Sequence, residues 1–531
     1  MAEPVQKFVK NDYINGEFVR YTLKLNDMKR ILILLAALSL CAGIQAQPLS
    51  RQFCNPLPME IGPGANASGD VTVMEHNGTY YMFCTGGGAW VSKDLLNWEY
   101  KEVKHVARIP VAPDVAKFNG KFYMSGNDAP LYVADDPLGP YTLVGDWTNT
   151  GDISEGWNGA FDTHIFVDDD NQPYLFWPGM AISGIYSTKL NKDDITQFEG
   201  PVTHHFSFNP NHVWERQGEH NEYPDVAWIE GPWIYKYKGT YYLQYSASGT
   251  QWRTYAEGYY KSKKLEGPYK FAENNPLLRR TDGVVTGPAH GSMVTGPDGN
   301  IWQFYTVVLR SGGRRIGMDR VIVDKKGNLI CDVTDTPQWA PGVVADPKKG
   351  DSGSIIISVG KTTMSTGEGF PGAAKIATSA KPGRGPEYAI DDNTATWWEP
   401  EDDDAQPTLM ISLSPAVDRD RVQTFAVDGA RILFGGGAGR GVRNAGLPVY
   451  KYKMEVSMDG KSWTTVVDQS ANKTPRNVVF DEFAPVEARY VKLTMLDWPK
   501  TGNFSILDFS VFGKATGWSP SQIPVPAPIT Y

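Results

Sequence analysis

Cysteine is scarce in this sequence, with 4 among 531 residues. Cys41 lies in an apolar segment near the N-terminus, which leaves Cys54, Cys84 and Cys331 in the rest of the chain. An odd number of cysteines without CxxC spacing excludes a disulfide framework and a zinc site of the usual pattern. We therefore expect these three cysteines to be buried free thiols.

An excess of positive charge is also lacking. The 51 basic and 60 acidic residues give a formal net charge of −9, and no long run of Lys or Arg occurs. This balance argues against nucleic acid or an anionic membrane surface as the main partner. Beyond Leu40, no apolar stretch is long enough to cross a membrane, so we expect no transmembrane segment.

The one apolar run near the N-terminus is short and resembles a secretory signal. Met28-Lys29-Arg30 supplies a basic start, the apolar run ends at Leu40, and small residues follow. This pattern predicts a signal peptide at 28–46, a secreted or periplasmic protein, and an upstream extension at 1–27. Cys41 raises the alternative of a lipid anchor, although Leu40 precedes it where a small residue is expected.

Glycine, proline and aromatic residues are plentiful. The chain has 54 Gly, 37 Pro and 16 Trp, and aromatic residues make up 12%. This composition indicates a folded, turn-rich protein, and at roughly 150 residues per domain the length allows two to four domains. Exposed aromatic rings suit a neutral ligand with polar edges and apolar faces, such as a carbohydrate.

One short pattern recurs five times: a turn of Asn-Gly or Asp-Gly character, followed by alternating aromatic and aliphatic residues. Such turns between alternating runs predict β-hairpins, because the central residues need positive φ. Several copies are followed by a second turn that would lead into an outer strand, as in Ser92–Trp98 and Leu265–Tyr269. Five similar all-β units indicate a five-bladed β-propeller at 47–345 rather than unrelated hairpins. The five hairpins begin at His76, Phe118, Asp169, Tyr237 and Pro297.

A polar residue stands one strand length before each hairpin. Because a propeller gathers the innermost strand of every blade around one axis, these residues are expected to converge. Several carboxylates around one pocket suit glycosidic bond cleavage, in which one stays protonated as the acid and one stays ionised to activate water. For any single member, a hydrogen-bonded structural carboxylate is the alternative. The five residues are Asp70, Asp114, Asp162, Glu230 and His290.

Residues 55–340 resemble glycoside hydrolase family 43, the five-bladed propeller group of arabinofuranosidases, xylosidases, arabinanases and galactanases. The resemblance is carried by Ser92-Lys93-Asp94-Leu95, Ala112-Pro113-Asp114, Phe161-Asp162, Glu230-Gly231-Pro232 and the Gly-Pro-Ala-His stretch that ends at His290. It implies that Asp70 is the catalytic base, Asp162 the carboxylate that orients the acid and adjusts its pKa, and Glu230 the general acid. The family usually has Asp-Pro at the base, whereas this chain has Asp70-Val71.

Two further residues of the propeller enter through the same resemblance. His290 falls at the position beneath the pocket, where many family members hold a calcium ion or water. Arg315 is expected to reach the substrate, with a packing arginine as the alternative. No cofactor is expected for the chemistry itself.

The repeated hairpin pattern ends and the composition of the sequence changes after residue 345, which indicates a second domain. We expect a linker or lead-in strand at 346–373, a β-sandwich of jelly-roll, galactose-binding-like form at 374–515, and a Pro-rich tail at 516–531. The sandwich resembles discoidin or coagulation-factor type-C domains, including carbohydrate-binding modules of family 32. The carriers are Ala389–Trp398, Ser457–Trp463, Ala488–Leu493 and Asp508–Gly513.

The resemblance of this second domain implies one structural Ca²⁺. Asp391, Thr396 and Asp508 would supply the oxygen ligands that Ca²⁺ prefers, with a hydrogen-bonded turn without metal as the alternative. The pair Trp397-Trp398 fits either the core or a stacking platform for sugar.

The sequence thus predicts an exo-acting, inverting hydrolase, expected to be a monomer, that removes terminal α-L-arabinofuranosyl residues from plant-type polysaccharides or oligosaccharides. A β-xylosidase, or a β-galactosidase or galactanase, of the same family is the first alternative. A non-catalytic glycan-binding protein is the second, and retention of three carboxylates argues against it.

Overall fold

The computed structural model divides the chain into two compact units, Met1–Arg51 and Gln52–Tyr531. In the first unit, β1 (Val9–Ile14) and β2 (Glu17–Thr22) form an antiparallel hairpin. Residues 28–46, where a signal peptide is expected, lie outside the described residues. None of the helices in the described part is long and apolar enough to cross a membrane. The structure describes residues 9–14, 17–22, 52–63, 67–104, 109–127, 129–147, 161–343, 352–364, 380–414, 421–435, 447–500 and 504–520.

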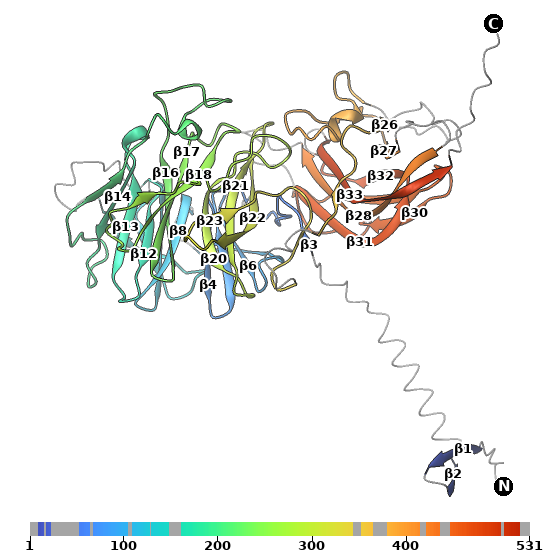
Figure 1. Ribbon diagram of the computed structural model, residues 1–531, viewed down its shortest axis with the longest axis horizontal. Coiled ribbons are helices and arrows are strands. Elements are labelled where there is room, and N and C mark those ends of the chain that lie inside the picture. Colours follow the sequence, from blue (N-terminus) through green and yellow to red (C-terminus); the bar gives the residue numbers. More distant parts are fainter. Residues whose placement is uncertain are drawn as a thin grey trace. The chain divides into compact units, whose positions relative to one another are not determined.

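Five four-stranded antiparallel sheets form the larger part of the second unit (Figure 1). In each sheet the strands follow one another in sequence order, as the blades of a propeller do. This arrangement confirms the predicted propeller. The blades comprise, in order, β4 (Thr72–His76), β5 (Thr79–Phe83), β6 (Ala89–Ser92) and β7 (Glu99–Lys101); β8 (Val111–Phe118), β9 (Lys121–Asn127), β10 (Leu131–Ala134) and β11 (Thr142–Gly145); β12 (His164–Val167), β13 (Pro173–Pro178), β14 (Ile185–Lys189) and β15 (Thr203–Phe206); β16 (Glu230–Tyr237), β17 (Thr240–Ala247), β18 (Ala256–Ser262) and β19 (Lys270–Phe271); and β20 (Ala289–Thr295), β21 (Ile301–Val308), β22 (Arg314–Val323) and β23 (Leu329–Cys331).

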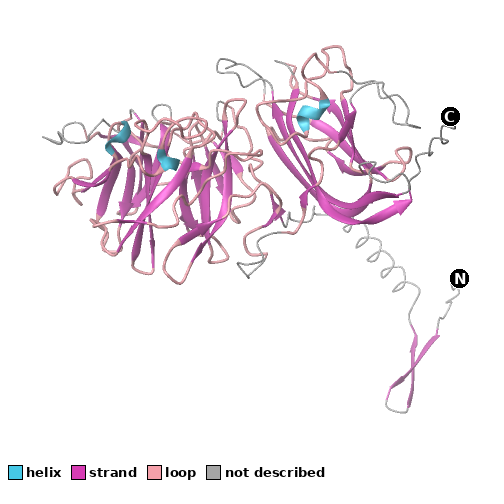
Figure 2. Ribbon diagram, turned by 45° about the horizontal axis from the view of Figure 1, so that its top comes forward, coloured by secondary structure: helices cyan, strands magenta, loops and turns pink. Residues whose placement is uncertain are grey.

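All five predicted hairpins join the first and second strands of a blade. The turn residues Asn77, Asn119 and Lys238 each have positive φ, and a glycine with positive φ follows each of them. Two consecutive residues of positive φ match the right-handed twist of the strands on either side. The short 3₁₀ helices η1 (Ala181–Ser183) and η2 (Val213–Glu215) lie together with many loops at one end of the blades (Figure 2).

Hydrophobic clusters fill the spaces between neighbouring blades. Trp302 and Phe304 of the fifth blade pack with Val73 and Met82 of the first, which closes the ring. Similar clusters join the first blade to the second, the second to the third, the third to the fourth and the fourth to the fifth. The three cysteines outside the N-terminal segment are free and buried within this unit, as expected.

The second domain is a β-sandwich with a four-stranded sheet in the order β25-β33-β28-β31 and a five-stranded sheet in the order β26-β27-β32-β29-β30. Trp398 belongs to the core between the sheets, and the guanidinium of Arg384 lies over the ring of the half-buried Trp397. The sandwich contains the 3₁₀ helix η4 (Pro386–Ala389) and the strands β25 (Ile355–Ile356), β26 (Thr362–Met364), β27 (Thr408–Ser412), β28 (Arg421–Gly435), β29 (Lys451–Ser457), β30 (Thr464–Asp468), β31 (Val478–Ala488), β32 (Tyr490–Asp497) and β33 (Ser505–Pro520).

The strands of the sandwich extend beyond the range expected from the sequence. β25 and β26 lie within 346–373, where a linker or lead-in strand is expected, and pair with β33 and β27. β33 continues to Pro520, into the stretch expected as a tail, and residues 521–531 lie outside the described part.

A buried arginine links the sandwich to the propeller. Arg431 of β28 is fully buried, and its Nη1 donates hydrogen bonds to the carbonyl oxygens of Asn55 (2.6 Å) and Asp335 (2.8 Å). Asn55 follows β3 (Gln52–Phe53) and Asp335 precedes β24 (Gln338–Trp339), two strands that pair with each other. One side chain of the sandwich therefore binds both ends of the propeller chain.

Removing this guanidinium is expected to destabilise the protein strongly. Arg431→Ala leaves the carboxylate of Asp508, which Arg431 Nε contacts at 3.2 Å, as an unpaired buried charge. Breaking a buried ion pair in this way costs about 3–5 kcal/mol. Urea denaturation should show a lower midpoint. The double variant Arg431→Met/Asp508→Leu should recover part of the loss, and a double variant that loses the full sum of both single changes would contradict the coupling.

Candidate active site

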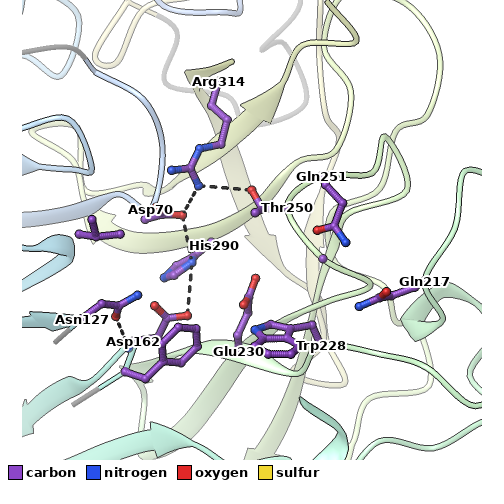
Figure 3. Close-up of a pocket in the computed structure, with 13 residues that line it drawn as sticks. Asp70, Asn127, Asp162, Gln217, Trp228, Glu230, Thr250, Gln251, His290 and Arg314 are labelled. Atoms are coloured by element: carbon purple, nitrogen blue, oxygen red, sulfur yellow. Dashed lines mark hydrogen bonds and ion pairs between the residues drawn. The ribbon is translucent and has the colours of Figure 1, made fainter. Parts of the chain in front are cut away.

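A cavity of about 480 Å³ opens on the propeller and collects most of the residues singled out in the sequence (Figure 3). Asp70, Asp162, Glu230 and His290 line it together, although they come from four different blades. Phe161 and Trp228 supply aromatic surface. The predicted convergence on one pocket is therefore correct for these residues.

An unusual backbone conformation begins most of the innermost strands. Asp70, Asp162 and His290 have φ values of 49°, 43° and 44°, in the left-handed region that non-glycine residues rarely adopt. At the corresponding point of the fourth blade, Gly231 has a φ of 57°, and a Cβ there would lie 2.8 Å from the ring of His290. The Glu-Gly sequence is thus required by close packing, and strained residues of this kind concentrate at functional sites.

The positive charges around Asp70 hold it in the ionised form. Its Oδ1 lies 2.7 Å from Nη1 of Arg314 and 3.2 Å from Nδ1 of His290, and its Oδ2 accepts a hydrogen bond from Thr85 (2.6 Å). Burial alone would raise the pKa of Asp70, but Arg314 and His290 outweigh burial and hold it well below its usual range. Asp70 is therefore a carboxylate that stays ionised to low pH.

Glu230 has the opposite character. Burial, with the adjacent carboxylate of Asp162, raises the pKa of Glu230 to about 8, so the group carries a proton at neutral pH. The hydroxyl of Tyr255 donates to Oε1 of Glu230 at 2.6 Å. With Oε1 occupied as an acceptor, Oε2 is the oxygen that can carry the proton toward the cavity.

His290 lies between the carboxylates. Its Nδ1 is 3.2 Å from Asp70 and 3.9 Å from Asp162. Burial would lower the pKa of His290, but Asp162 and Asp70 raise it to about 10, so the ring is a cation at neutral pH. Burial raises the pKa of Asp162, and this charged ring opposes the effect. The pocket thus combines a proton donor and an ionised acceptor, the pair that acid–base chemistry requires.

The structure corrects the assignment of Arg315 to the pocket. Arg314 lines the cavity, and Arg315 is not among the lining residues. Successive side chains of a strand point to opposite faces, so the two neighbours in β22 cannot both face the pocket. Arg315 is half-buried, and its Nη1 donates to the carbonyl oxygen of Arg314 at 2.8 Å.

Asp114 also lies away from the main cavity. The positive φ of its strand falls on Ala112, two residues earlier, and a register shift follows in β8. The carboxylate of Asp114 accepts a hydrogen bond from the backbone of Ile165 (2.8 Å) and lies 3.2 Å from Nδ1 of His164. Its contacts are those of a structural carboxylate.

The comparisons with known families agree with this geometry. The family model for Glycosyl hydrolases family 43 matches residues 64–328, and the F5/8 type C domain matches residues 374–508. Residues 64–328 form a glycosyl hydrolase family 43 domain. The family 43 domain contains the pocket, and the F5/8 type C domain is the sandwich that carries Arg431.

Curated relatives of this chain are named for different activities. A xylosidase/arabinosidase of Butyrivibrio fibrisolvens is 25% identical over 276 residues, covering 46% of this chain and 49% of the relative. A β-D-galactofuranosidase of Aspergillus niger is 26% identical over 247 residues (42% and 65%), and an extracellular endo-α-(1→5)-L-arabinanase of Bacillus subtilis is 27% identical over 257 residues (39% and 51%). The chain thus spans about half to two thirds of the length of these relatives.

A solved structure of a thermostable family 43 glycoside hydrolase is 26% identical, covers 54% of this chain and 99% of its own, and has a TM-score of 0.45. A second solved glycoside hydrolase is 22% identical, covers 86% of this chain and 99% of its own, and has the same TM-score.

The F5/8 type C domain does not fit the expected calcium site. Asp391 and Thr396 share one loop, where the Thr396 hydroxyl donates to Asp391 at 2.7 Å. The carboxylate of Asp508 instead contacts the guanidinium of Arg431 and accepts a hydrogen bond from Ser510 (2.9 Å). A guanidinium therefore holds the position beside Asp508 that a cation would need.

The calcium ion expected under the pocket of the family 43 domain stays a prediction. Among the described residues, the group with ligand atoms close enough for a metal ion is Asp162, Glu230 and His290, all within 4.8 Å of one another. With no cation present, burial raises the pKa of Glu230, and the neighbouring carboxylates outweigh burial and raise that of His290; a bound cation would act in the opposite direction on both groups. The neighbouring cavity of about 20 Å³, beside Asp114, has room for about one water molecule.

Several residues that shape the family 43 site carry no signal in the sequence. Arg314, Thr85 and Tyr255 contact the carboxylates directly but lie far from them along the chain. Asn127 accepts a hydrogen bond from the backbone of Asp162 at 2.5 Å. The arginine pair Arg314-Arg315 is visible in the sequence, but which member faces the pocket depends on strand register.

The paired pKa values of the family 43 site predict an asymmetric pH profile. kcat/KM should fall as the pH rises through about 8, where Glu230 loses its proton, and should show no acid limb in the usual carboxylate range. Arg314→Gln removes a positive charge beside Asp70, so its pKa rises and the acid limb moves to higher pH. Arg315→Gln makes the same chemical change outside the pocket and serves as the control. Equal shifts in both variants would contradict the assignment.

Proposed function

We propose that this protein is an exo-acting, inverting glycoside hydrolase that removes terminal α-L-arabinofuranosyl residues from plant-type polysaccharides or oligosaccharides. The observation that carries the proposal is the pairing, in one pocket, of a protonated Glu230 with an ionised Asp70. Arabinose appears in the names of two of the relatives described above, which supports this sugar over its alternatives.

In the proposed reaction, Glu230 Oε2 donates its proton to the glycosidic oxygen as the bond from that oxygen to the anomeric carbon breaks. Asp70 accepts a proton from a water molecule, whose oxygen bonds to the anomeric carbon from the opposite face. The anomeric configuration is therefore inverted. A carboxylate has about four acceptor sites, so Asp70 can bind the water while it accepts from Thr85.

The other charged groups prepare these two residues. Burial keeps Glu230 protonated, and the adjacent Asp162 adds to this effect because two neighbouring carboxylates cannot both ionise easily. Arg314 and His290 fix the orientation of Asp70 and compensate its charge in a buried site. Their positive charges also make Asp70 a weak base. A weak base suits a reaction in which the glycosidic bond breaks ahead of attack by water, so that positive charge develops on the sugar.

Product analysis tests the proposal. Nitrophenyl α-L-arabinofuranoside, β-D-xylopyranoside and β-D-galactopyranoside are compared, and NMR identifies the first anomer released. Preferential cleavage of the arabinofuranoside with inversion is expected. Preference for the xyloside or galactoside would assign the alternative sugars, retention would overturn the mechanism, and no hydrolysis of glycosides at all would favour a glycan-binding protein.

We further propose that the protein acts outside the cytoplasm, because of the signal sequence expected at 28–46. Expression in a secreting host should yield a shortened chain that starts after residue 46, as N-terminal sequencing would establish.

A further inference from the structure

Two amide side chains of the pocket have no role in the acid–base chemistry. Gln217 and Gln251 line the cavity, and neither side-chain amide has a hydrogen-bond partner within the described part of the chain. By contrast, charged residues that line the cavity form ion pairs with one another, as Arg314 does with Asp70. Each free amide offers two donor hydrogens and an acceptor oxygen to a ligand.

The positions of these amides relative to Glu230 indicate what they face. In an inverting reaction the acid lies on the leaving-group side of the anomeric carbon, and the base lies on the opposite side. Figure 3 shows Gln217 and Gln251 on the far side of Glu230 from Asp70, with Trp228 beside Glu230. The part of the substrate that leaves must therefore extend toward the two amides.

The loops that carry the amides are held together before any ligand binds. The backbone N–H of Gln217 donates to Val226 (2.9 Å), and the hydroxyl of Thr254 donates to the carbonyl of the next residue, Gly218 (2.7 Å). Arg253 forms an ion pair with Glu219 at 3.0 Å. A site on tied loops loses little entropy when it binds a ligand.

Two aromatic residues, Tyr223 and Trp252, are backbone neighbours of the amides, although neither is among the residues that line the cavity. Tyr223 closes the loop through a bridge with Gln217, Trp252 follows Gln251 directly, and the two rings lie 6.3 Å apart. The side chain of Tyr223 is 46% exposed, which is high for a large aromatic group. Amides near one exposed ring, Tyr223, match the alternating hydroxyl edges and apolar faces of a sugar.

We propose that Gln217 and Gln251 bind the leaving-group sugar and so determine which glycosides the enzyme cleaves well. The proposal rests on the hydrolase function proposed above and adds to it the class of leaving group: a sugar residue of an oligosaccharide or polysaccharide, bound through its hydroxyls. An aryl leaving group has no hydroxyls for the amides to bind.

The test compares two substrates with the same terminal sugar. kcat/KM is measured on the nitrophenyl glycoside and on an oligosaccharide for the wild type, Gln217→Ala, Gln251→Ala and the double variant. The ratio of oligosaccharide to nitrophenyl kcat/KM should fall about 3–10-fold in each single variant, the size of a lost hydrogen bond, and further in the double variant. Gln406→Ala, an exposed glutamine of the sandwich, is the control and should leave the ratio unchanged.

Product inhibition gives a second measurement. The oligosaccharide released by cleavage should inhibit the wild type, and its inhibition constant should rise in the double variant by a factor similar to the fall in the ratio. A ratio and an inhibition constant within twofold of wild type would overturn the role of the amides. Failure of the wild type to cleave either substrate would instead overturn the hydrolase function itself.

Discussion

Glu230→Gln should lower kcat by about 10²–10⁴-fold on oligosaccharides, the usual contribution of a general acid. An amide has the shape of the protonated carboxylic acid but cannot give up a proton at neutral pH. The hydroxyl of Tyr255 can still donate to the amide oxygen of the variant, so the pocket should keep its form. The loss should therefore appear in kcat rather than in KM.

The leaving group distinguishes this loss from general damage. A nitrophenolate departs without protonation, so Glu230→Gln should cleave aryl glycosides far better than oligosaccharides. The alkaline limb of the pH profile should also vanish on aryl substrates, because it reports the proton on Glu230. Equal losses on both classes of substrate would remove Glu230 from the role of acid.

Asp70→Asn should lower turnover strongly for every leaving group. Water must lose a proton whatever departs, so the loss of about 10²–10⁴-fold should be similar on aryl glycosides and oligosaccharides. The amide also places a donor group in a pocket where Arg314, His290 and Thr85 all donate. Steady-state kinetics on the two substrate classes gives the measurement.

A small anion can replace the missing carboxylate in this variant. Azide should restore part of the cleavage of an aryl glycoside by Asp70→Asn and give a glycosyl azide of inverted configuration, which NMR would identify. The matched control is Asp168→Asn, a carboxylate that pairs with Lys236 on the same propeller outside the pocket. High activity of Asp70→Asn without azide would show that another group activates the water.

Much of the propeller could be predicted because its signals are local. The turns Asn77-Gly78 and Asn119-Gly120 specify hairpins through their own backbone preferences, and the structure has hairpins at both. A repeated unit then fixes the architecture, since equal blades close a ring. The same reasoning brought Asp70, Asp162 and Glu230 to one pocket.

The predictions for Arg315 and Asp508 failed because strand register, or a contact between residues far apart in the sequence, decides where these side chains lie. Arg314 and Arg315 differ only in which face of β22 they occupy, and a shift of one residue exchanges their roles. The resemblance of the second domain implied a calcium ligand at Asp508, whereas the structure pairs Asp508 with Arg431, 77 residues earlier. Nothing local to either residue reveals that pair.

The position of Arg431 also limits how this gene can be recombined. A propeller separated from its sandwich would leave the carbonyls of Asn55 and Asp335 without their donor, at the seam where the ring begins and ends. An accessory module exchanged for the sandwich would need a cationic side chain at the same point. We therefore expect a propeller without its sandwich to be less stable at this junction, although the packing of the fifth blade on the first still closes the ring.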